Sequence, residues 1–258
     1  MRQPVESIGT ISMSSSSASV GKFLTLNTLA YPKDAYDRNI TWKSSDTSIA
    51  TVTGQITNNQ QGKVYCKKSG TVTITASSGD KSKSVNISCK DTVSLTTYQF
   101  KLFVASGQND SGYFDFETTG AAKDVTVTST NTSVATVNVL GVSGTTGRIR
   151  VNPVNYGSTT IKFTPANGTS AYLDITVDKY ELILTKNYAT VVTTCKWTTT
   201  SFSLKHNGTT IDYDYILING KKYGGKYVSM QLSSSSAIVS VGGVEYNAYI
   251  THAENNQC

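Results

Sequence analysis

The sequence predicts an all-β protein made of two tandem β-sandwiches followed by a third β-rich module. Apolar and polar residues alternate along most of the chain, and no ten-residue stretch has the 3.6-residue spacing of a helix. Two stretches are nearly the same, TWKSSDTSIATV at 41–52 and TVTSTNTSVATV at 126–137. A Gly and an alternating run follow each copy, so the repeat unit is a small domain of about 85 residues, larger than a solenoid repeat.

The composition agrees with this fold class. Of the 258 residues, 38% are hydrophobic and 16% are charged, which is too apolar for a charged disordered chain and suits half-buried strands. The net charge of +6 and the pI of about 9.0 would suit nucleic acid, but the Lys and Arg residues are scattered and not interleaved with aromatics. We expect no nucleic-acid partner, and no membrane partner because no window approaches the ~20 apolar residues of a span.

The first sandwich is predicted over residues 8–90, after an N-terminal arm of residues 1–7. Trp42 shares one strand face with Ile40, so we expect it to anchor the core between two sheets. The segment Ser44 to Asp46 is a turn, because short polar side chains bond to nearby backbone amides. We expect Asp46 to serve this turn and not to bind calcium, because no other carboxylate lies in the same predicted loop.

This pattern resembles the bacterial Ig-like group 2 family. In that family a strand ends in Trp-x-Ser-Ser-x-x-x-x-Ala-Thr-Val, and a Gly-Thr-x-x-Ile-x-Ala element follows; both are present here, at 42–52 and 70–76. The resemblance implies that each copy is an Ig-like sandwich. The second copy, predicted over 91–178, has Val127 where the first has Trp42, and it keeps Ser129, Ala135, Val137, Gly157 and Ile161.

The last segment, residues 179–258, lacks the repeat and is predicted as a β-rich module of hairpins. Asn207-Gly208 and Gly242-Gly243 are strong hairpin turn signals. The module carries eight of the fifteen tyrosines, namely Tyr180, Tyr188, Tyr213, Tyr215, Tyr223, Tyr227, Tyr246 and Tyr249. Aromatics with a polar tip are favoured at interfaces, so we predict a docking surface here, with tyrosines that border a small core as the alternative.

The four cysteines, Cys66, Cys89, Cys195 and Cys258, form no CxxC pair and have no zinc spacing. Cys66 and Cys89 fall in one predicted sandwich and could meet across strands. We expect free thiols, because a reducing cytoplasm keeps buried cysteines reduced; a Cys66–Cys89 disulfide is the alternative.

We predict no enzyme, no cofactor, and no catalytic, cofactor-binding or metal-ligating residue. The histidines are His206, beside a predicted turn, and His252, near the end of the sequence. The sequence has no nucleophile elbow, phosphate loop or dinucleotide fingerprint. The sequence has only five glutamates, so the carboxylate pair of a glycosidase would have to come mostly from loop aspartates.

From these observations we expect a non-enzymatic structural component of a phage virion, in capsid decoration, tail or fibre. Residues 1–10 lack the apolar run of a signal peptide, which suggests assembly in a cytoplasm and release by lysis. Its partners would be other virion proteins or a second copy, through the Tyr-rich module, and surface glycans through the weak adhesion that the resemblance implies. The alternative is a fragment of a secreted bacterial adhesin or cell-wall-associated protein, located at the cell surface.

Overall fold

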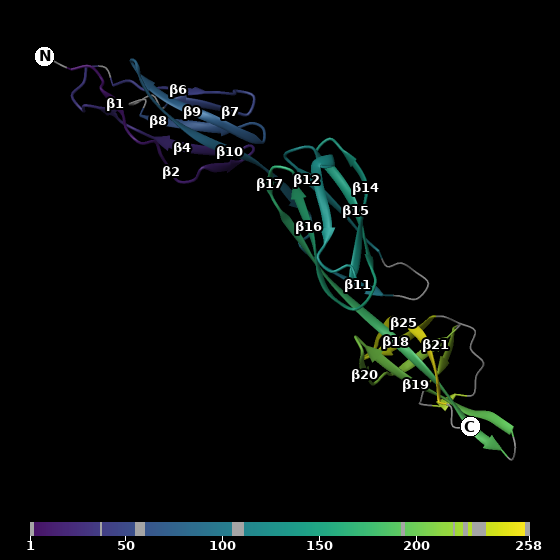
Figure 1. Cartoon of the computed structure of the whole chain (residues 1–258). Coiled ribbons are helices and arrows are strands. Elements are labelled where there is room, and N and C mark those ends of the chain that lie inside the picture. Colours follow the sequence, from purple (N-terminus) through teal and green to yellow (C-terminus); the bar gives the residue numbers. More distant parts are fainter. Residues whose placement is uncertain are drawn as a thin grey trace.

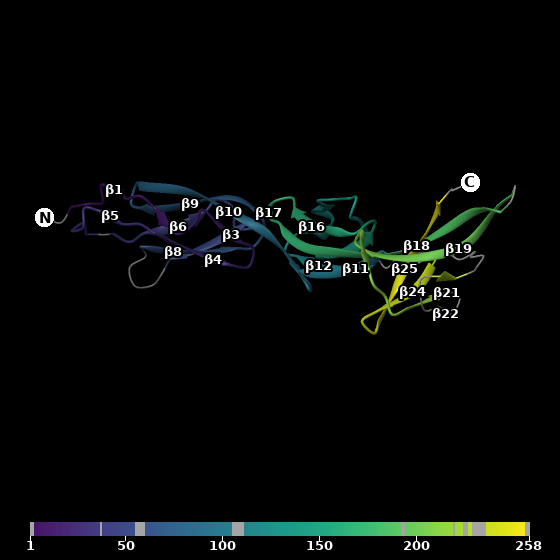
Figure 2. The same ribbon diagram turned by 90° about the horizontal axis from the view of Figure 1, so that it is seen from below.

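The computed structural model is a row of three β bodies (Figures 1 and 2). It describes residues 3–36, 38–54, 60–104, 111–191, 194–218, 220–223, 227–228 and 236–255. Each body is built around its own cluster of buried apolar side chains. We call them the first sandwich (β1 to β9 and the first half of β10), the second sandwich (the end of β10 to the first half of β18) and the C-terminal module. The all-β prediction is confirmed: apart from one 3-10 turn, η1 (Ala122–Asp124), the regular structure described is strand.

Two facing sheets form the first sandwich. One has the order β2-β4-β8-β7, and the other joins β3, β10, β9 and β6, while β1 and β5 pair at one end. The strands are β1 (Ser7–Ile8), β2 (Ser12–Met13), β3 (Ser17–Ser19), β4 (Phe23–Asn27), β5 (Ala30–Tyr31), β6 (Thr41–Ser44), β7 (Ala50–Gly54), β8 (Gln61–Cys66), β9 (Gly70–Ser78) and β10 (Lys81–Leu95).

The core of the first sandwich contains the predicted Trp42, which is 8% exposed. Its indole lies over Gly62 of β8, where an added Cβ would come within 2.7 Å of the ring. The glycine is therefore a packing requirement of the tryptophan, since any larger residue would overlap it.

Cys66 and Cys89 form a disulfide, so the expectation of free thiols is wrong for this pair. Cys66 ends β8 in one sheet and Cys89 lies in β10 of the other, and both are fully buried. The facing strands bring their Cα atoms to 5.5 Å, within the range that a disulfide spans. The bridge therefore ties the two sheets together through the core. Cys258 and the side chain of Cys195 lie outside what the structure describes.

The expected N-terminal arm differs from the structure over residues 3–7. The Glu6 amide donates to the Tyr31 carbonyl, and Ser7 pairs with Tyr31 in the β1–β5 ladder. Val5 packs against the first core. These residues belong to the first sandwich because pairing on β5 satisfies their backbone groups and buries an apolar side chain.

The second sandwich repeats the arrangement. One sheet has the order β14-β15-β12 and takes in the end of β10, while the other joins β11, β18, β16 and β13. Its strands are β11 (Gln99–Val104), β12 (Gly112–Thr118), β13 (Val125–Ser129), β14 (Ala135–Ser143), β15 (Thr146–Pro153), β16 (Gly157–Pro165), β17 (Gly168–Thr169) and β18 (Ala171–Val191).

The repeated turn has the same hydrogen bonds in both sandwiches. Asp46 Oδ1 accepts from the Ser48 amide at 2.8 Å, and Asn131 Oδ1 accepts from the Ser133 amide at 3.1 Å. The residue after each of these serines packs against a glycine with positive φ. Ile49 lies against Gly70, and Val134 lies against Gly157. The repeat is a fold element, and the predicted structural role of Asp46 is confirmed.

Two strands run through the predicted boundaries at 90/91 and 178/179, which remain predictions. β10 leaves the first sandwich and enters the second, and β18 continues from the second sandwich into the C-terminal module (Figure 1). At the first joint the Asp91 amide donates to the Asn167 carbonyl at 2.8 Å, and Asp91 Oδ1 accepts from the Thr119 hydroxyl at 3.1 Å. Continuous strands therefore connect the bodies.

The C-terminal module packs hairpins beside the second half of β18. The predicted turn at Asn207-Gly208 closes the β19–β20 hairpin, with Asn207 at φ 50°, and Gly242-Gly243 closes β24–β25. Both hairpin predictions are confirmed. The strands are β19 (Thr194–His206), β20 (Thr209–Ile211), β21 (Tyr215–Ile218), β22 (Lys221–Tyr223), β23 (Tyr227–Val228), β24 (Ser236–Val241) and β25 (Val244–Asn255).

Candidate binding surfaces

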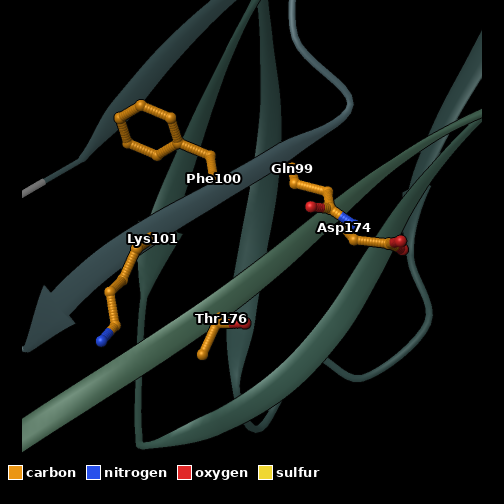
Figure 3. Close-up of a pocket in the computed structure, with 5 residues that line it drawn as sticks. All are labelled: Gln99, Phe100, Lys101, Asp174 and Thr176. Carbon is orange, nitrogen blue, oxygen red and sulfur yellow. The ribbon is translucent and has the colours of Figure 1, made fainter.

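A shallow groove of about 380 Å³ lies on the second sandwich, between β11 and β18 (Figure 3). The two strands pair in parallel, with Gln99 opposite Asp174 and Lys101 opposite Thr176. These four polar side chains are exposed. On β18, the residues on either side of Asp174 and of Thr176 are buried. Figure 3 shows Gln99 beside Asp174 at one end of the groove, with Lys101 and Thr176 nearer the other.

A second groove of about 370 Å³ continues the first across the same sheet. It shares Asp174 and Thr176 with the first groove and is otherwise lined by Thr130 and by Ser158, Thr159, Thr160 and Ile175. The Thr160 hydroxyl donates to Asp174 Oδ1 at 2.8 Å. Tyr172, two residues before Asp174 on β18, is 51% exposed. This surface offers hydroxyls, an amide and a carboxylate, with the aromatic ring of Tyr172 on the same strand.

The edge of the phenyl ring of Phe100 completes one wall of the first groove. Phe100 is 45% exposed, and it meets Phe114 edge to face with ring centroids 5.1 Å apart. Figure 3 shows its ring directed away from Asp174. It therefore borders the groove and is not stacked over the polar groups.

A third hollow, of about 640 Å³, lies beside the β14–β15 hairpin. Leu140 and Val142 are 51% and 43% exposed there, next to a register shift in β14. Arg148 donates from Nε and Nη2 to the two carboxylate oxygens of Asp115, at 2.7 and 3.0 Å. These hydrogen bonds, more than the charges alone, lower the pKa of Asp115 and raise that of Arg148. This wall is therefore a solvent-exposed ion pair.

Four tyrosines of the C-terminal module whose side chains the structure describes lie in or against its core. Tyr180 and Tyr223 are 6% and 7% exposed, and Tyr213 and Tyr246 pack against the same cluster. Tyr215 donates from its hydroxyl to Glu245 at 2.7 Å. The side chains of Tyr188, Tyr227 and Tyr249 lie outside what the structure describes. Among the side chains that the structure describes, the large exposed tyrosines are in the two sandwiches: Tyr31, Tyr36, Tyr98, Tyr113, Tyr156 and Tyr172.

The joint between the second sandwich and the C-terminal module is built around the buried Asp178, which is 6% exposed. Its carboxylate lies 2.6 Å from Lys101 Nζ and 3.5 Å from His206 Nε2, and it accepts from Asn207 Nδ2 at 3.1 Å. Burial alone would raise the pKa of Asp178, but the hydrogen bonds from Lys101 and Asn207 outweigh burial and lower it. The Asn207 turn was the sequence signal for part of this cluster. The turn alone could not reveal the cluster, because its position opposite β18 depends on long-range pairing.

His206 stacks on Tyr180 at the same joint, with ring centroids 4.5 Å apart. Burial, and then the hydrogen bond with Tyr246, raise the pKa of Tyr180 to about 12. The side chain of His252 lies outside the described residues. In the part of the chain that the structure describes, no three His, Cys, Asp or Glu side chains come together as a metal site would require, and we find no helix of the length and apolar character that crossing a membrane takes.

The first sandwich is similar to a known family of domains. Residues 5–88 match the model of the bacterial Ig-like domain (group 2), as the resemblance predicted. An uncharacterized protein of Clostridium acetobutylicum is 36% identical over 126 residues, which cover 45% of this chain and 12% of that protein. This chain therefore corresponds to a small part of the relative.

Solved structures with Ig-like folds are also similar. Domains 4 and 5 of the S-layer protein SbsC are 20% identical, covering 58% of this chain and 89% of that one, with a TM-score of 0.28. A C-terminal fragment of intimin, in complex with the intimin-binding domain of the translocated intimin receptor, is 17% identical, covering 69% of this chain and 66% of that one, with a TM-score of 0.35.

Proposed function

We propose that this protein is a non-enzymatic surface protein of a bacterium, in which Ig-like bodies hold an adhesive surface away from the cell. The observation that carries the proposal is the buried Cys66–Cys89 disulfide, which joins the two sheets of the first sandwich. Disulfides persist in secreted and surface proteins and are rare in a reducing cytoplasm. The match of residues 5–88 to a bacterial Ig-like domain supports the same location.

The arrangement of the bodies supports a spacer role. The three bodies follow one another in a row, and continuous strands connect them (Figures 1 and 2). Such a row separates its two ends by the summed length of the bodies. A surface at one end is thereby held clear of an anchor at the other.

The two joined grooves on the second sandwich are the surface that we propose for adhesion. Asp174 and Thr176 line both of them, and the neighbouring hydroxyls and the exposed Tyr172 suit neutral glycans. Weak contacts of this kind gain strength when many copies are displayed together. An NMR titration with soluble glycans tests the assignment: Asp174→Ala should abolish the shifts, whereas Asp115→Ala, on the other sheet, should leave them unchanged.

The virion role that the sequence first suggested is the competing proposal, and one experiment separates the two. Intact cells of the source organism are treated with protease, and the released peptides and purified phage particles are examined by mass spectrometry. A surface protein gives peptides of this chain in the fraction shaved from the cells. Recovery only in particles, at a fixed ratio to capsid or tail protein, would support the virion role and contradict the surface role.

A further inference from the structure

We propose that the first sandwich carries a separate binding site for an acidic polysaccharide, on the outer face of β4 and β8. The site is made of two aromatic rings, Phe23 and Tyr65, and the ammonium group of Lys63. It lies on another body than the two grooves proposed for neutral glycans, and it takes a charged ligand. The choice of a polysaccharide among polyanions rests on the proposed surface role.

The excess positive charge of the chain is concentrated in the first sandwich. Residues 1–90 contain 11 Lys and Arg and 5 Asp and Glu, which gives a net charge of +6, whereas residues 91–258 contain 12 of each kind. A surface with an excess of one sign attracts ligands of the opposite sign and raises their local concentration. The first sandwich is therefore the body suited to a polyanion.

Two aromatic rings and a lysine meet on the outer face of β4 and β8, which lie side by side (Figure 1). Phe23 of β4 is opposite Tyr65 of β8, and their ring centroids are 4.8 Å apart. Lys63 Nζ lies 4.3 Å from the centroid of the Phe23 ring. Phe23 is 58% exposed, so this patch is open to solvent. Phe23 and Tyr65 are far apart in the sequence, and only strand pairing brings them together.

The ammonium group of Lys63 is available to an incoming anion. Over the residues that the structure describes, Lys63 forms no ion pair with a carboxylate, and it is held over a ring that leaves its charge intact. Thr25 of β4 and Thr53 of β7 lie opposite Lys63 on its two sides, and both are exposed. Their hydroxyls can donate to or accept from sugar oxygens beside the cation.

Two more lysines extend the positive patch at one end of these strands. Lys22 precedes Phe23, Lys67 follows Tyr65 by two residues, and both are exposed. The Cys66 amide donates to the Lys22 carbonyl at 3.2 Å, which keeps the two segments side by side. A polymer with an anion on each repeat can contact several of these lysines at once, and linked weak contacts strengthen one another.

The chemistry of the patch favours an acidic polysaccharide. Aromatic rings offer apolar faces, and ammonium groups form charge-assisted hydrogen bonds with anionic oxygens. An acidic sugar has both an apolar C–H face and an anionic group, so it complements both. Single-stranded nucleic acid also combines rings with anions, but the buried disulfide favours a location outside a reducing cytoplasm. Nucleic acid is therefore the competitor in the test.

The test measures binding of the purified full chain to immobilised dextran sulfate and polygalacturonate. Unmodified dextran has the same backbone as dextran sulfate without its charge. The protein should bind both acidic polymers, more weakly as the salt concentration rises, and should not bind dextran. Failure to bind either acidic polymer at low salt would overturn the proposal.

Three variants distinguish a built site from a diffuse attraction. Lys63→Gln should weaken binding by about two- to fivefold, the effect of losing one exposed charge pair. Lys43→Gln removes the same charge from an exposed position of β6 in the opposite sheet and should leave the affinity nearly unchanged. Phe23→Thr keeps the charge and suits a strand, and it should also weaken binding. Phe23→Tyr retains the ring and should keep the affinity of the wild type.

An NMR titration of the wild-type chain with a galacturonic acid oligomer makes the test independent of whether each variant folds. The amide signals of β4 and β8 should shift, and those of β6 should not. Equal weakening by Lys43→Gln and Lys63→Gln, with no effect of Phe23→Thr, would overturn the site.

Tighter binding to oligo-dT than to the acidic polysaccharides would also contradict the proposal, because the patch would then recognise nucleic acid. These measurements concern the first sandwich of the purified protein. The neutral-glycan titration concerns the second sandwich, and the protease and mass spectrometry experiment concerns location. A failure of this inference is therefore distinguishable from a failure of the proposed function.

Discussion

The first and second sandwiches have the same strand order and the same turn, but they fill their centres differently. Trp42 faces the first core, and Val127 occupies the equivalent place in the second. The volume is recovered by Phe163, where the first sandwich has Ala76, and Phe116 adds a second buried ring beside it. The rings of Phe116 and Phe163 lie 5.3 Å apart.

In each body a glycine of the β8 or β15 strand accommodates an aromatic ring. Gly62 lies under Trp42, which comes from the opposite sheet, and Gly147 lies under Phe116, which comes from the neighbouring strand. At the places of Cys66 and Cys89 the second sandwich has the half-buried Pro153, opposite Ala135, and the fully buried Val177, opposite Gly157. This fold therefore requires a filled centre of fixed volume, but the strand that contributes the large side chain can change.

The largest difference between the sandwiches should appear at the Trp42 position. Trp42→Ala should cost the first sandwich about 3–5 kcal/mol, because it removes a buried aromatic ring and leaves a cavity. The equivalent Val127→Ala should cost the second about 1 kcal/mol, because the side chain is smaller and only partly buried. Hydrogen exchange resolved by peptide reads each body separately. Equal losses at the two positions would mean that the centre of the first sandwich does not depend on its tryptophan.

The disulfide gives the next largest effect. Replacing Cys66 and Cys89 together by Val should lower the unfolding free energy of the first sandwich by about 3 kcal/mol through loss of the cross-link. Denaturation with and without a reducing agent measures this in the wild-type protein and the variant. The reciprocal variant Pro153→Cys with Val177→Cys should form a bridge in the second sandwich on oxidation. Two thiols that remain free there would show that the two bodies are not equivalent at this position.

The aromatic exchange can be tested by swapping residues between the bodies. Val127→Trp should destabilise the second sandwich by about 1–3 kcal/mol, because Phe163 already fills that space. Adding Phe163→Ala gives the second sandwich the same pair of residues as Trp42 and Ala76 in the first. This second substitution should recover part of the lost stability. The double-mutant cycle should give a favourable coupling of about 0.5–3 kcal/mol. Strictly additive effects would indicate that the two positions fill their space independently.

The smallest effect is a difference in pH dependence at the repeated turn. The side-chain and backbone hydrogen bonds from Ser48 lower the pKa of Asp46, whereas the equivalent Asn131 does not titrate. Asp46 therefore stabilises the first sandwich above its unfolded-state pKa, and this contribution is lost as the pH falls through the lower folded-state value, below about pH 4. Asp46→Asn should remove this acid-dependent part, and Asn131→Asp should introduce it in the second sandwich. Hydrogen exchange between pH 3 and 6 compares them; identical profiles for Asp46→Asn and the wild type would contradict the assignment.

Much of the fold could be predicted from short-range patterns. The repeat, the alternation around Trp42 and the Asn207-Gly208 turn each depend on neighbouring residues, and the structure agrees with them. The disulfide was expected only as the alternative, because a reducing cytoplasm was assumed and such a compartment keeps thiols reduced. The two grooves were missed for a different reason, since they combine residues of β11, β16 and β18 that only the sheet brings together.

The Tyr-rich composition of the C-terminal module was a weaker guide than it seemed. A count of tyrosines does not reveal which face of a strand each occupies, and Tyr180 and Tyr223 face the core. Docking through this module remains a prediction. The exposed aromatic rings of the two sandwiches, such as Tyr36 and Tyr113, are spread through the sequence, so their composition gave no local signal.

The most direct test of the surface role is the redox state of Cys66 and Cys89 in the protein as its source organism makes it. Cells are lysed in a thiol-alkylating reagent, and tryptic peptides are mapped by mass spectrometry before and after reduction. A surface protein should give the two cysteines unlabelled and joined in one cross-linked peptide, in the cell-surface fraction. Two alkylated cysteines without prior reduction, in a cytoplasmic fraction, would contradict the account.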